Sequence, residues 1–482
     1  LFSSASFVGC ADIRVTQASD DSRDCTPGCL FAAIPGSKHN GNTFIEDAIA
    51  EGASSLLCSH PIPNVTVPQC VVPHVRSAYA KLCQSLLGSP SERLTTIGVT
   101  GTNGKTTTSY LIRSILQRAK YRTGLLGTIE YHDGLTSEES ELTTPDAPHL
   151  ANWLARMVAN ETSHAVFELS SHALDQGRAA GVGLSVAVVT NITQDHLDYH
   201  KSFDTYRKSK SQILNLCKSN AVVVLNREDQ AAYSLLDDIP RNLKVITFGF
   251  HPDATIRATI TNQSLDATKF RIEFPSQGVS VSTSLTGLHN VENCLAAAAA
   301  CYYIGITPSQ IVAGIEELTN VPGRLESIDL GQEYRIFVDY AHTDDALKRC
   351  LETLKPLTKN KLICVFGAGG DRDRTKRPLL ARAAQLADCI IVTNDNPRTE
   401  DPKQIINDIL EGFPIQTRGV HVEPFRERAI QLAMDFANPD DTLLVAGKGH
   451  ETYQIIGQTK YHFDDKEVIR NQLNRKLMRI PA

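Results

Sequence analysis

Eight consecutive residues have the composition of a phosphate-binding loop: Thr100-Gly101-Thr102-Asn103-Gly104-Lys105-Thr106-Thr107. Glycines in such a loop let backbone N–H groups point inward at an anion. Lys105 would reach the terminal phosphates of a nucleotide, and the hydroxyl of Thr106 would face Mg²⁺. The glycine spacing is not that of the common G-x-x-x-x-G-K-[ST] pattern, because the residue five before Gly104 is Val99. A tight glycine-rich turn is therefore the alternative.

The elements on either side of this loop favour phosphate binding. Residues 95–99 form an apolar run that predicts a strand. After the loop, apolar side chains recur at three- and four-residue steps and predict a helix: Tyr110, Leu111, Ile112, Ile115 and Leu116. A helix that starts at the loop adds the positive end of its dipole to the site.

Two more predicted strands end in side chains that could bind a metal. Residues 165–167 run into Glu168, and residues 186–189 run into a polar segment that contains His196. Ligands of open α/β sheets lie at the carboxyl ends of the strands. Glu168, His196 and Thr106 are therefore candidate Mg²⁺ ligands. The alternatives are an exposed charge at a strand end for Glu168 and an ordinary polar loop residue for His196.

The bulk composition describes a folded chain of several domains. It has 482 residues, of which 41% are hydrophobic and 21% charged, and this length suggests two to four domains. A formal charge of −6 argues against general nucleic-acid binding. No apolar run is long enough to span a membrane, and no signal peptide is visible. The twelve scattered cysteines suggest buried free thiols in a reducing cytoplasm.

We predict three α/β domains. Residues 1–91 form a small domain with strands at 30–34, 56–58 and 71–72 and helices at 44–53 and 75–87. Residues 92–325 form the nucleotide domain, a mostly parallel sheet with antiparallel strands added between residues 254 and 285. An alanine-rich helix follows, and we expect its alanine run at residues 296–300 to pack in the core. Residues 326–482 form a second doubly wound unit.

Four polar clusters follow strands in the last domain, whose strands are predicted at 335–338, 361–366, 389–393 and 442–446. The clusters are Asp339-Tyr340-Ala341-His342, residues 367–373, Asp395-Asn396-Pro397-Arg398 and Gly447-Lys448-Gly449-His450-Glu451. Each follows an apolar strand, so all should lie at one edge of the sheet. Their mixed charge suggests a ligand with both amino and carboxylate groups.

The motifs together resemble one known family. The loop Gly101-Thr102-Asn103-Gly104-Lys105-Thr106 resembles the variant phosphate loop of the Mur ligases, and further motifs follow that family's order to the C-terminus. The resemblance covers nearly the whole chain. It implies a three-domain, ATP-dependent, amide-forming ligase of peptidoglycan precursor synthesis. The small first domain would bind a uridine nucleotide, and the last, Rossmann-like domain would bind an amino acid.

The resemblance also implies roles for individual residues. Beyond the loop, Asn290, Arg324 and Asp339 would contact ATP. The UDP-linked muramoyl-peptide substrate would be held by Ser22, Ser37, Lys38, His39, Thr143, Thr144, Ser170, Gln176 and Arg178. Lys105, Glu168, His196 and Lys210 would be the catalytic residues.

Lys210 matches the lysine that is carbamylated in this family. As a carbamate it would become an oxygen ligand of Mg²⁺, beside Thr106, Glu168 and His196. Without the resemblance, Lys210 is one of three basic residues on a helix face and would be predicted to be exposed to solvent.

The incoming amino acid would be bound by residues of the last domain: Arg372, Asp395, Asn396, Pro397, Arg398, Gly447 and Glu451. Family members that add meso-diaminopimelate carry D-N-P-R, whereas those that add L-lysine lack this arginine. Arg398 could bind the distal carboxylate of diaminopimelate with two hydrogen bonds. The implied reaction joins meso-diaminopimelate to the D-glutamate γ-carboxylate of UDP-N-acetylmuramoyl-L-alanyl-D-glutamate, through an acyl phosphate.

One residue departs from the family pattern. Asp344 stands where proline usually follows D-Y-A-H-T, and we expect Asp344 to cap the following helix instead. The remaining alternatives are the same ligase with L-lysine, a folylpolyglutamate synthetase-like ligase, a nucleotide-dependent switch or motor, and a homologue that only binds. We expect a cytoplasmic monomer that acts on small molecules, without nucleic acid or membrane insertion.

Overall fold

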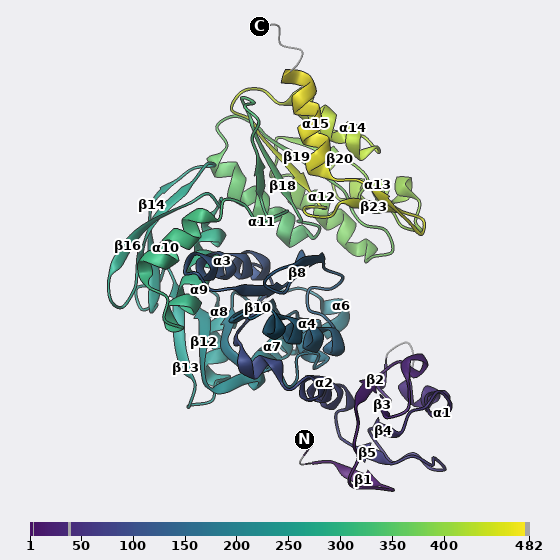
Figure 1. Ribbon diagram of the computed structural model, residues 1–482. Helices are drawn as coiled ribbons and strands as arrows, with labels where there is room; N and C mark the ends of the chain where they lie inside the picture. The colour runs from purple at the N-terminus through teal and green to yellow at the C-terminus, as the bar shows by residue number, and fades with distance from the viewer. Residues whose placement is uncertain (3, 37–39, 478–482) are drawn as a thin grey trace. The chain divides into compact units, whose positions relative to one another are not determined.

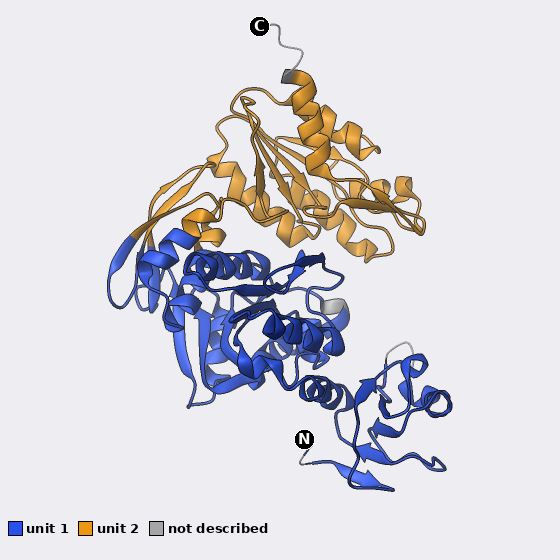
Figure 2. Cartoon of the chain, viewed as in Figure 1, with its two compact units in different colours: residues 1–258, 272–279, 292–314 blue, residues 259–271, 280–291, 315–482 orange. Residues whose placement is uncertain are grey.

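The computed structural model describes residues 1–2, 4–36 and 40–477, apart from the side chains of Leu197, Asp198 and Leu477. The chain divides into two compact units (Figure 2). One comprises residues 1–258, 272–279 and 292–314, and the other comprises residues 259–271, 280–291 and 315–482. Within the described ranges, no helix is long and apolar enough to cross a membrane. The α/β class predicted from the sequence is confirmed.

The first sheet has five strands in the order β1-β5-β4-β3-β2, with only the β1–β5 pair antiparallel. Strand residues alternate between its two faces. Leu30 and Leu57 pack with Tyr79 on one face, and Phe31 packs with Ile45 on the other. The element bounds are β1 (Ser6–Val8), β2 (Gln17–Ser19), β3 (Cys29–Ala32), α1 (Ile45–Ala50), β4 (Ser55–Cys58), β5 (Gln69–Val71) and α2 (Val75–Leu86).

The second sheet has eleven strands in the order β16-β15-β14-β13-β12-β11-β6-β10-β7-β8-β9. Neighbouring pairs from β14 to β7 are parallel, and β7–β8 and β8–β9 are antiparallel. Its strands are β6 (Thr95–Thr100), β7 (Thr123–Leu126), β8 (Glu130–His132), β9 (Ser137–Glu139), β10 (His164–Glu168), β11 (Leu184–Val189), β12 (Cys217–Asn226), β13 (Lys244–Gly249), β14 (Ile256–Gln263), β15 (Thr268–Glu273) and β16 (Gly278–Thr283).

Helices follow the parallel strands of this sheet (Figure 1). Residues 296–300, the alanine run, are fully buried, so their predicted place in the core is confirmed. The added strands differ from the prediction at one point, because β14 pairs with β13 in parallel. The helices are α3 (Lys105–Arg118), α4 (Ala147–Ala159), α5 (Ser171–Asp175), α6 (Leu197–His200), α7 (Phe203–Ser211), α8 (Gln230–Tyr233), α9 (Leu288–Tyr303) and α10 (Pro308–Glu317).

The third sheet has the order β17-β18-β22-β19-β20-β21, and its five strands from β18 to β21 pair in parallel. Helices α11, α12 and α13 cover one face, and α14 and α15 cover the other (Figure 1). The bounds are β17 (Glu326–Ile328), β18 (Arg335–Asp339), α11 (Asp344–Leu354), β19 (Leu362–Phe366), α12 (Arg377–Ala384), β20 (Cys389–Val392), α13 (Pro402–Leu410), β21 (Val420–Val422), α14 (Arg426–Phe436), β22 (Thr442–Ala446) and α15 (Asp465–Leu477).

A short hairpin follows β22 and belongs to none of these sheets. It consists of β23 (Tyr453–Ile456) and β24 (Thr459–His462), paired antiparallel. The parallel strands that were predicted agree with the structure to within a residue or two. The sequence did not predict this hairpin, nor β1, β2, β7, β8, β9, β12, β13, β17 and β21.

Candidate active site

The glycine-rich loop lies between β6 and α3 and is tightly packed against neighbouring elements. Gly101 and Gly104 have φ angles of 151° and 85°, which favour glycine. A Cβ atom on Gly101 would lie 1.9 Å from the hydroxyl of Thr190, and one on Gly104 would lie 2.3 Å from the Asn293 amide oxygen. The loop therefore requires both glycines, even though their spacing is not the common one.

The end of β11 holds the loop from the other side. The side-chain amide of Asn191 accepts from the Asn103 backbone N–H at 2.9 Å and donates to the Asn103 carbonyl at 3.0 Å. The Thr190 hydroxyl donates to the same carbonyl at 2.6 Å. The loop conformation is thus built into the folded unit rather than formed by a ligand.

Lys105 and Lys210 meet at this loop. The Lys105 amine donates to the carbonyls of Gly101 and Thr102, each at 2.9 Å. The Lys210 amine, from α7, donates to the same Gly101 carbonyl at 2.7 Å. The two amines therefore share one carbonyl acceptor within the loop.

Lys210 is buried, with 1% of the residue exposed, so the prediction of an exposed lysine made without the family resemblance was wrong. Its nitrogen lies 4.6 Å from the centre of the Tyr206 ring. Burial, and next the charge of Lys105, lower the pKa of Lys210 well below its ordinary value. The amine is thereby biased toward the neutral form.

Glu168, at the end of β10, is a buried carboxylate beside the loop. It accepts from the Thr106 hydroxyl at 3.1 Å, from the Thr128 hydroxyl at 2.9 Å and from the Thr128 backbone N–H at 3.0 Å. None of these described partners carries a positive charge. A buried carboxylate with neutral partners, next to a threonine hydroxyl, is an arrangement that fits a bound Mg²⁺ ion.

His196 lies beyond the end of β11 in a left-handed backbone conformation, with φ of 51°. Its ring meets that of His172 edge-on, with centroids 4.9 Å apart. Partial burial lowers the pKa of His196 to about 4, with Asp195 opposing and His172, Lys105 and Lys210 reinforcing the shift. This shift favours the neutral imidazole, whose lone pair can bind a metal.

The predicted muramoyl-peptide residues of the central region form a connected strip next to Glu168. The Thr144 hydroxyl donates to the Glu168 carbonyl at 2.7 Å and accepts from the Ser170 N–H at 3.0 Å. Arg178 donates to the Thr144 carbonyl at 3.2 Å and to the Gln176 side chain at 2.8 Å. Thr143 joins the strip through its hydroxyl, which lies 3.2 Å from the Thr128 hydroxyl.

Of the predicted uridine contacts, Ser22 lies among the described residues. Ser22 begins a short 3₁₀ turn that is capped by the Asp21 side chain, which also pairs with Arg23. Hydrogen bonds from Arg23 lower the pKa of Asp21 to about 2. The predicted contacts Ser37, Lys38 and His39 lie outside the described residues.

In the second unit, the predicted amino-acid residues lie together at the carboxyl edge of the sheet. Asn396 donates to Glu451 at 3.0 Å, and its oxygen accepts from the Lys448 amine at 3.0 Å. Lys448 also lies 3.8 Å from Asp395 and 3.6 Å from Glu451. A Cβ atom on Gly447 would lie 2.6 Å from Asp395 Oδ2, so this position requires glycine.

Arg398 and Arg372 lie beside the loop after β19. Arg398 has φ of 52°, and its guanidinium donates to the Gly370 carbonyl at 2.8 Å. A Cβ atom on Gly370 would lie 1.9 Å from the Pro397 carbonyl oxygen. Arg372 is exposed and donates to the Asp371 carbonyl at 3.1 Å.

The remaining predicted ATP contacts also belong to the second unit. Asp339 accepts from the backbone N–H groups of Leu325 and Ala341, at 2.6 and 2.8 Å, and burial raises its pKa. Arg324 lies 5.0 Å from the Tyr340 ring centre. Asn290, near the start of α9, donates to the Thr286 carbonyl at 2.8 Å.

Asp344 does not cap α11, contrary to the prediction. Thr343 is the cap, and its hydroxyl accepts from the Ala346 N–H at 3.3 Å. Asp344 occupies the first helical position, where a negative charge favours the positive end of the helix dipole. The helix begins normally because threonine is itself a good capping residue.

Three residues of the site were missed by sequence reasoning: Thr128, Tyr206 and Lys448. Thr128 and Tyr206 carry no spacing signal, because each acts on a residue distant in the sequence: Thr128 on Glu168, and Tyr206 on Thr102 and Lys210. Lys448 lies inside the predicted polar cluster 447–451, but the sequence did not indicate that its side chain is buried.

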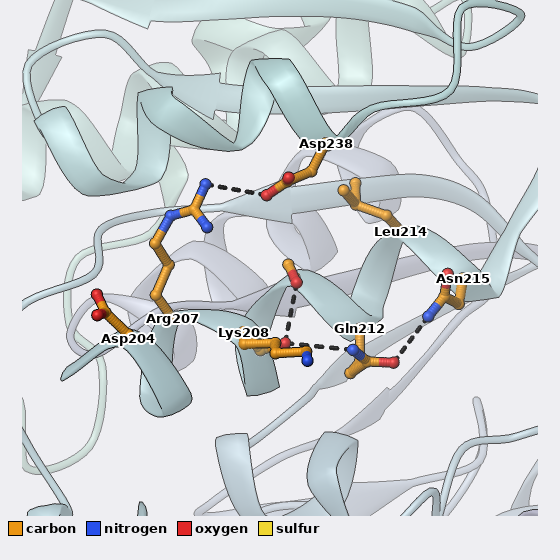
Figure 3. Close-up of a pocket in the computed structure, with 8 residues that line it drawn as sticks. Asp204, Arg207, Lys208, Gln212, Leu214, Asn215 and Asp238 are labelled. Carbon is orange, nitrogen blue, oxygen red and sulfur yellow. Dashed lines mark hydrogen bonds and ion pairs between the residues drawn. The ribbon is translucent and has the colours of Figure 1, made fainter. Parts of the chain in front are cut away.

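A pocket of about 460 Å³ lies on the outer side of α7 (Figure 3). Arg207 points across it to Asp238 at 2.9 Å, and Lys208 also lines it. The pocket includes none of the predicted site residues, although Lys208 is only two residues before Lys210. Its lining is Asp204, Arg207, Lys208, Ser211, Gln212, Leu214, Asn215 and Asp238.

Comparison with known proteins defines the class to which this fold and site belong. The description "Mur ligase middle domain" matches residues 99–301, "Mur ligase, glutamate ligase domain" matches residues 323–449, and "Mur ligase family, catalytic domain" matches residues 15–86. The chain belongs to the Mur ligase family.

Relatives within the family are similar over nearly their whole length. A UDP-N-acetylmuramoyl-L-alanyl-D-glutamate–2,6-diaminopimelate ligase of Bacillus cereus is 40% identical, with 96% of this chain and 95% of that protein covered. The equivalently named protein of Gloeobacter violaceus is 41% identical, with 97% and 96% covered. A solved structure of such a ligase is 34% identical, with a TM-score of 0.71 and with 96% and 95% covered.

Proposed function

We propose that this chain is an ATP-dependent ligase that joins meso-diaminopimelate to the D-glutamate γ-carboxylate of UDP-N-acetylmuramoyl-L-alanyl-D-glutamate. Membership of the Mur ligase family and relatives at about 40% identity with this name support the reaction. The substrates are small molecules, and we expect the chain to act on them in the cytoplasm as a monomer, during peptidoglycan precursor synthesis.

The reaction needs an activated carboxylate. The γ-phosphoryl group of ATP moves to the D-glutamate γ-carboxylate and gives an acyl phosphate. The amine of diaminopimelate then attacks the acyl carbon, and phosphate leaves from the tetrahedral intermediate. Because phosphates and carboxylate repel one another, the enzyme must neutralise charge and align the groups. The phosphate loop, from Gly101 to Thr107, and the amine of Lys105 supply positive charge at the phosphates.

The residues at the loop fit a magnesium ion. Thr106, Glu168 and neutral His196 would hold it, and Lys210 would join them as a carbamate. A carbamate forms when a neutral amine attacks CO₂ and loses a proton, and burial biases Lys210 to this neutral state. Bound Mg²⁺ would offset negative charge on the transferring phosphoryl group.

The observation that carries the choice of amino acid is the charge pattern around Asn396. Two carboxylates, Asp395 and Glu451, face one ammonium, Lys448, which leaves one negative charge unbalanced. Arg398 adds a guanidinium on the same loop. An amino acid whose far end carries both an ammonium and a carboxylate satisfies both groups, and diaminopimelate has such an end whereas L-lysine lacks the carboxylate.

The decisive assay measures ADP release by the full chain with UDP-N-acetylmuramoyl-L-alanyl-D-glutamate, comparing meso-diaminopimelate with L-lysine. We expect turnover to require the muramoyl dipeptide and to be much faster with diaminopimelate. Equal or faster turnover with L-lysine would overturn the substrate choice. ADP release independent of both substrates would favour a switch or motor instead.

A further inference from the structure

Lys448 is fully buried, yet its amine is the centre of the amino-acid cluster. It donates to the Asn396 side chain at 3.0 Å and to the Tyr453 carbonyl at 2.6 Å. It also lies within 4 Å of carboxylate oxygens of both Asp395 and Glu451. One nitrogen atom therefore ties together the loop after β20, the loop after β22 and the hairpin strand β23.

Strand β23 contacts three of the four residues of the Asp395-Asn396-Pro397-Arg398 segment. The Gln454 side chain donates to the Asp395 carbonyl at 2.6 Å, and the Ile455 N–H donates to the Asn396 side-chain oxygen at 2.9 Å. The Arg398 N–H donates to the Ile455 carbonyl at 3.0 Å.

The hairpin also binds the backbone carbonyl of Arg398. The Gly457 N–H donates to this carbonyl at 2.7 Å, and Arg398 forms an isolated parallel bridge with Ile456. Arg398 is thereby held at a φ of 52°, a conformation that costs a non-glycine residue free energy and persists only where neighbours enforce it.

We infer that Lys448 and β23 position the amino-acid site: Lys448 fixes the side chains of Asn396 and Glu451, and β23 fixes the backbone that carries Arg398. The inference rests on the proposed function, since it assigns these residues to selection of the incoming amino acid. Lys448 is a positioning residue, because its buried amine binds the Asn396 side chain and the Tyr453 carbonyl.

The charge of Lys448 also sets the charge of the site. Burial raises the pKa of Glu451 and lowers that of Lys448, and their closeness opposes both shifts. With Lys448 present, the cluster has one surplus negative charge for the ammonium of the ligand. Without it, the carboxylates of Asp395 and Glu451 would lose a cation that lies within 4 Å of both.

The test compares Lys448→Met and Gln454→Met with the control Lys355→Met. Lys355 lies in the same unit and is paired with Asp388 at 2.5 Å, but it precedes β19 and so lies at the opposite edge of the sheet. Steady-state KM values are measured for meso-diaminopimelate, ATP and the muramoyl dipeptide, together with the unfolding temperature of each variant.

We expect Lys448→Met to raise the KM for meso-diaminopimelate on the order of 10- to 100-fold, since a buried charge-assisted contact is lost. Gln454→Met should raise it by about fivefold, roughly the loss of one neutral hydrogen bond. The KM values for ATP and the dipeptide should change by less than about twofold, the scale of a surface substitution. Lys355→Met should leave all three unchanged.

Three outcomes would overturn the inference. One is a folded Lys448→Met variant with the wild-type KM for diaminopimelate. Another is a parallel rise of all three KM values, which indicates general destabilisation. If Lys448→Met does not fold, Gln454→Met decides in the same way. Wild-type turnover that does not depend on diaminopimelate would instead refute the proposed function, so the two failures are distinguishable.

Discussion

Lys105 and Lys210 direct their amine nitrogens at the same acceptor, the carbonyl oxygen of Gly101, at 2.9 and 2.7 Å. Two ammonium groups this close repel each other, and the repulsion is strong where water is excluded. Lys105 remains the charged partner, because Lys210 is buried and its pKa is lowered. The lowered pKa of Lys210 favours the neutral amine, the state that the proposed carbamylation requires.

The first prediction concerns Lys210. We expect Lys210→Ala to reduce turnover by about 100-fold, because the site would lose the oxygen ligand that the proposed carbamate would supply. Turnover of the wild type should rise with added bicarbonate after CO₂ has been removed, whereas the variant should not respond. Lys208→Ala is the matched control, since Lys208 is exposed on the same helix. A bicarbonate response that persists in Lys210→Ala would contradict the assignment.

Lys105→Ala should abolish ATP-dependent ligation while the chain stays folded. The hydrogen bonds from Asn191 and Thr190 to the loop remain when Lys105 is replaced, so the circular dichroism spectrum and unfolding temperature should be close to wild type. We expect a loss of turnover of about 100- to 1,000-fold, measured as ADP release. A folded variant with unchanged turnover would refute the phosphate-loop assignment.

The next prediction concerns Thr128, whose hydroxyl donates to the Glu168 carboxylate. Thr128→Val removes the hydroxyl that donates to Glu168 at 2.9 Å but keeps the shape of the side chain. Groups that orient a metal ligand typically contribute about tenfold to metal affinity or activity, and we expect the Mg²⁺ concentration for half-maximal turnover to rise by that factor. Thr136→Val, in the loop between β8 and β9, is the control. An unchanged Mg²⁺ requirement would mean that Thr128 has no such role.

The sequence predicted many of the parallel strands and the polar residues at their ends, because buried parallel strands are continuous apolar runs bounded by turn signals. Thr95–Thr100 and Leu362–Phe366 are examples. The short edge strands escaped prediction because they are polar. Ser137–Glu139, for instance, is fully exposed, and hydrogen bonding to its neighbour alone makes it a strand.

The site was predictable where chemistry follows a motif and unpredictable where it depends on burial. Lys105 stands in a recognisable loop. Lys210 was predicted from residues alone to be exposed, and only the fold places it under the loop, against Tyr206. Likewise, nothing in the sequence near residues 453–456 signals that this strand holds Arg398, because those hydrogen bonds use backbone groups that every residue has.

The stability of the chain should fall as the pH falls below 6.5, in part because of His164. Burial lowers the pKa of His164 from 6.5 to about 4. Between these values the unfolded chain binds a proton that the folded chain does not, so the free energy of unfolding decreases as pH decreases. His164 alone contributes up to roughly 3 kcal/mol over this window.

His164→Phe, which keeps a ring next to Tyr121, should therefore make the free energy of unfolding less dependent on pH between 6.5 and 4. Urea unfolding at several pH values measures it. His149→Phe, a change at an exposed position, serves as the control and should leave the slope unchanged. The interpretation is wrong if the free energy of unfolding decreases equally with falling pH in the wild type and in His164→Phe.

Arg398 offers the sharpest test of the amino-acid choice. In Arg398→Ala the guanidinium that donates to Gly370 is lost, and with it the cation proposed for the distal carboxylate. Losing a charge-assisted contact should raise the KM for meso-diaminopimelate about 10- to 100-fold. L-lysine has no carboxylate at that end, so the slow turnover with L-lysine should be unaffected. The preference for meso-diaminopimelate over L-lysine should therefore decrease by the same factor. Arg382→Ala, on the exposed face of α12, should preserve the preference. An Arg398→Ala variant that still prefers diaminopimelate as strongly as the wild type would show that the selectivity lies elsewhere.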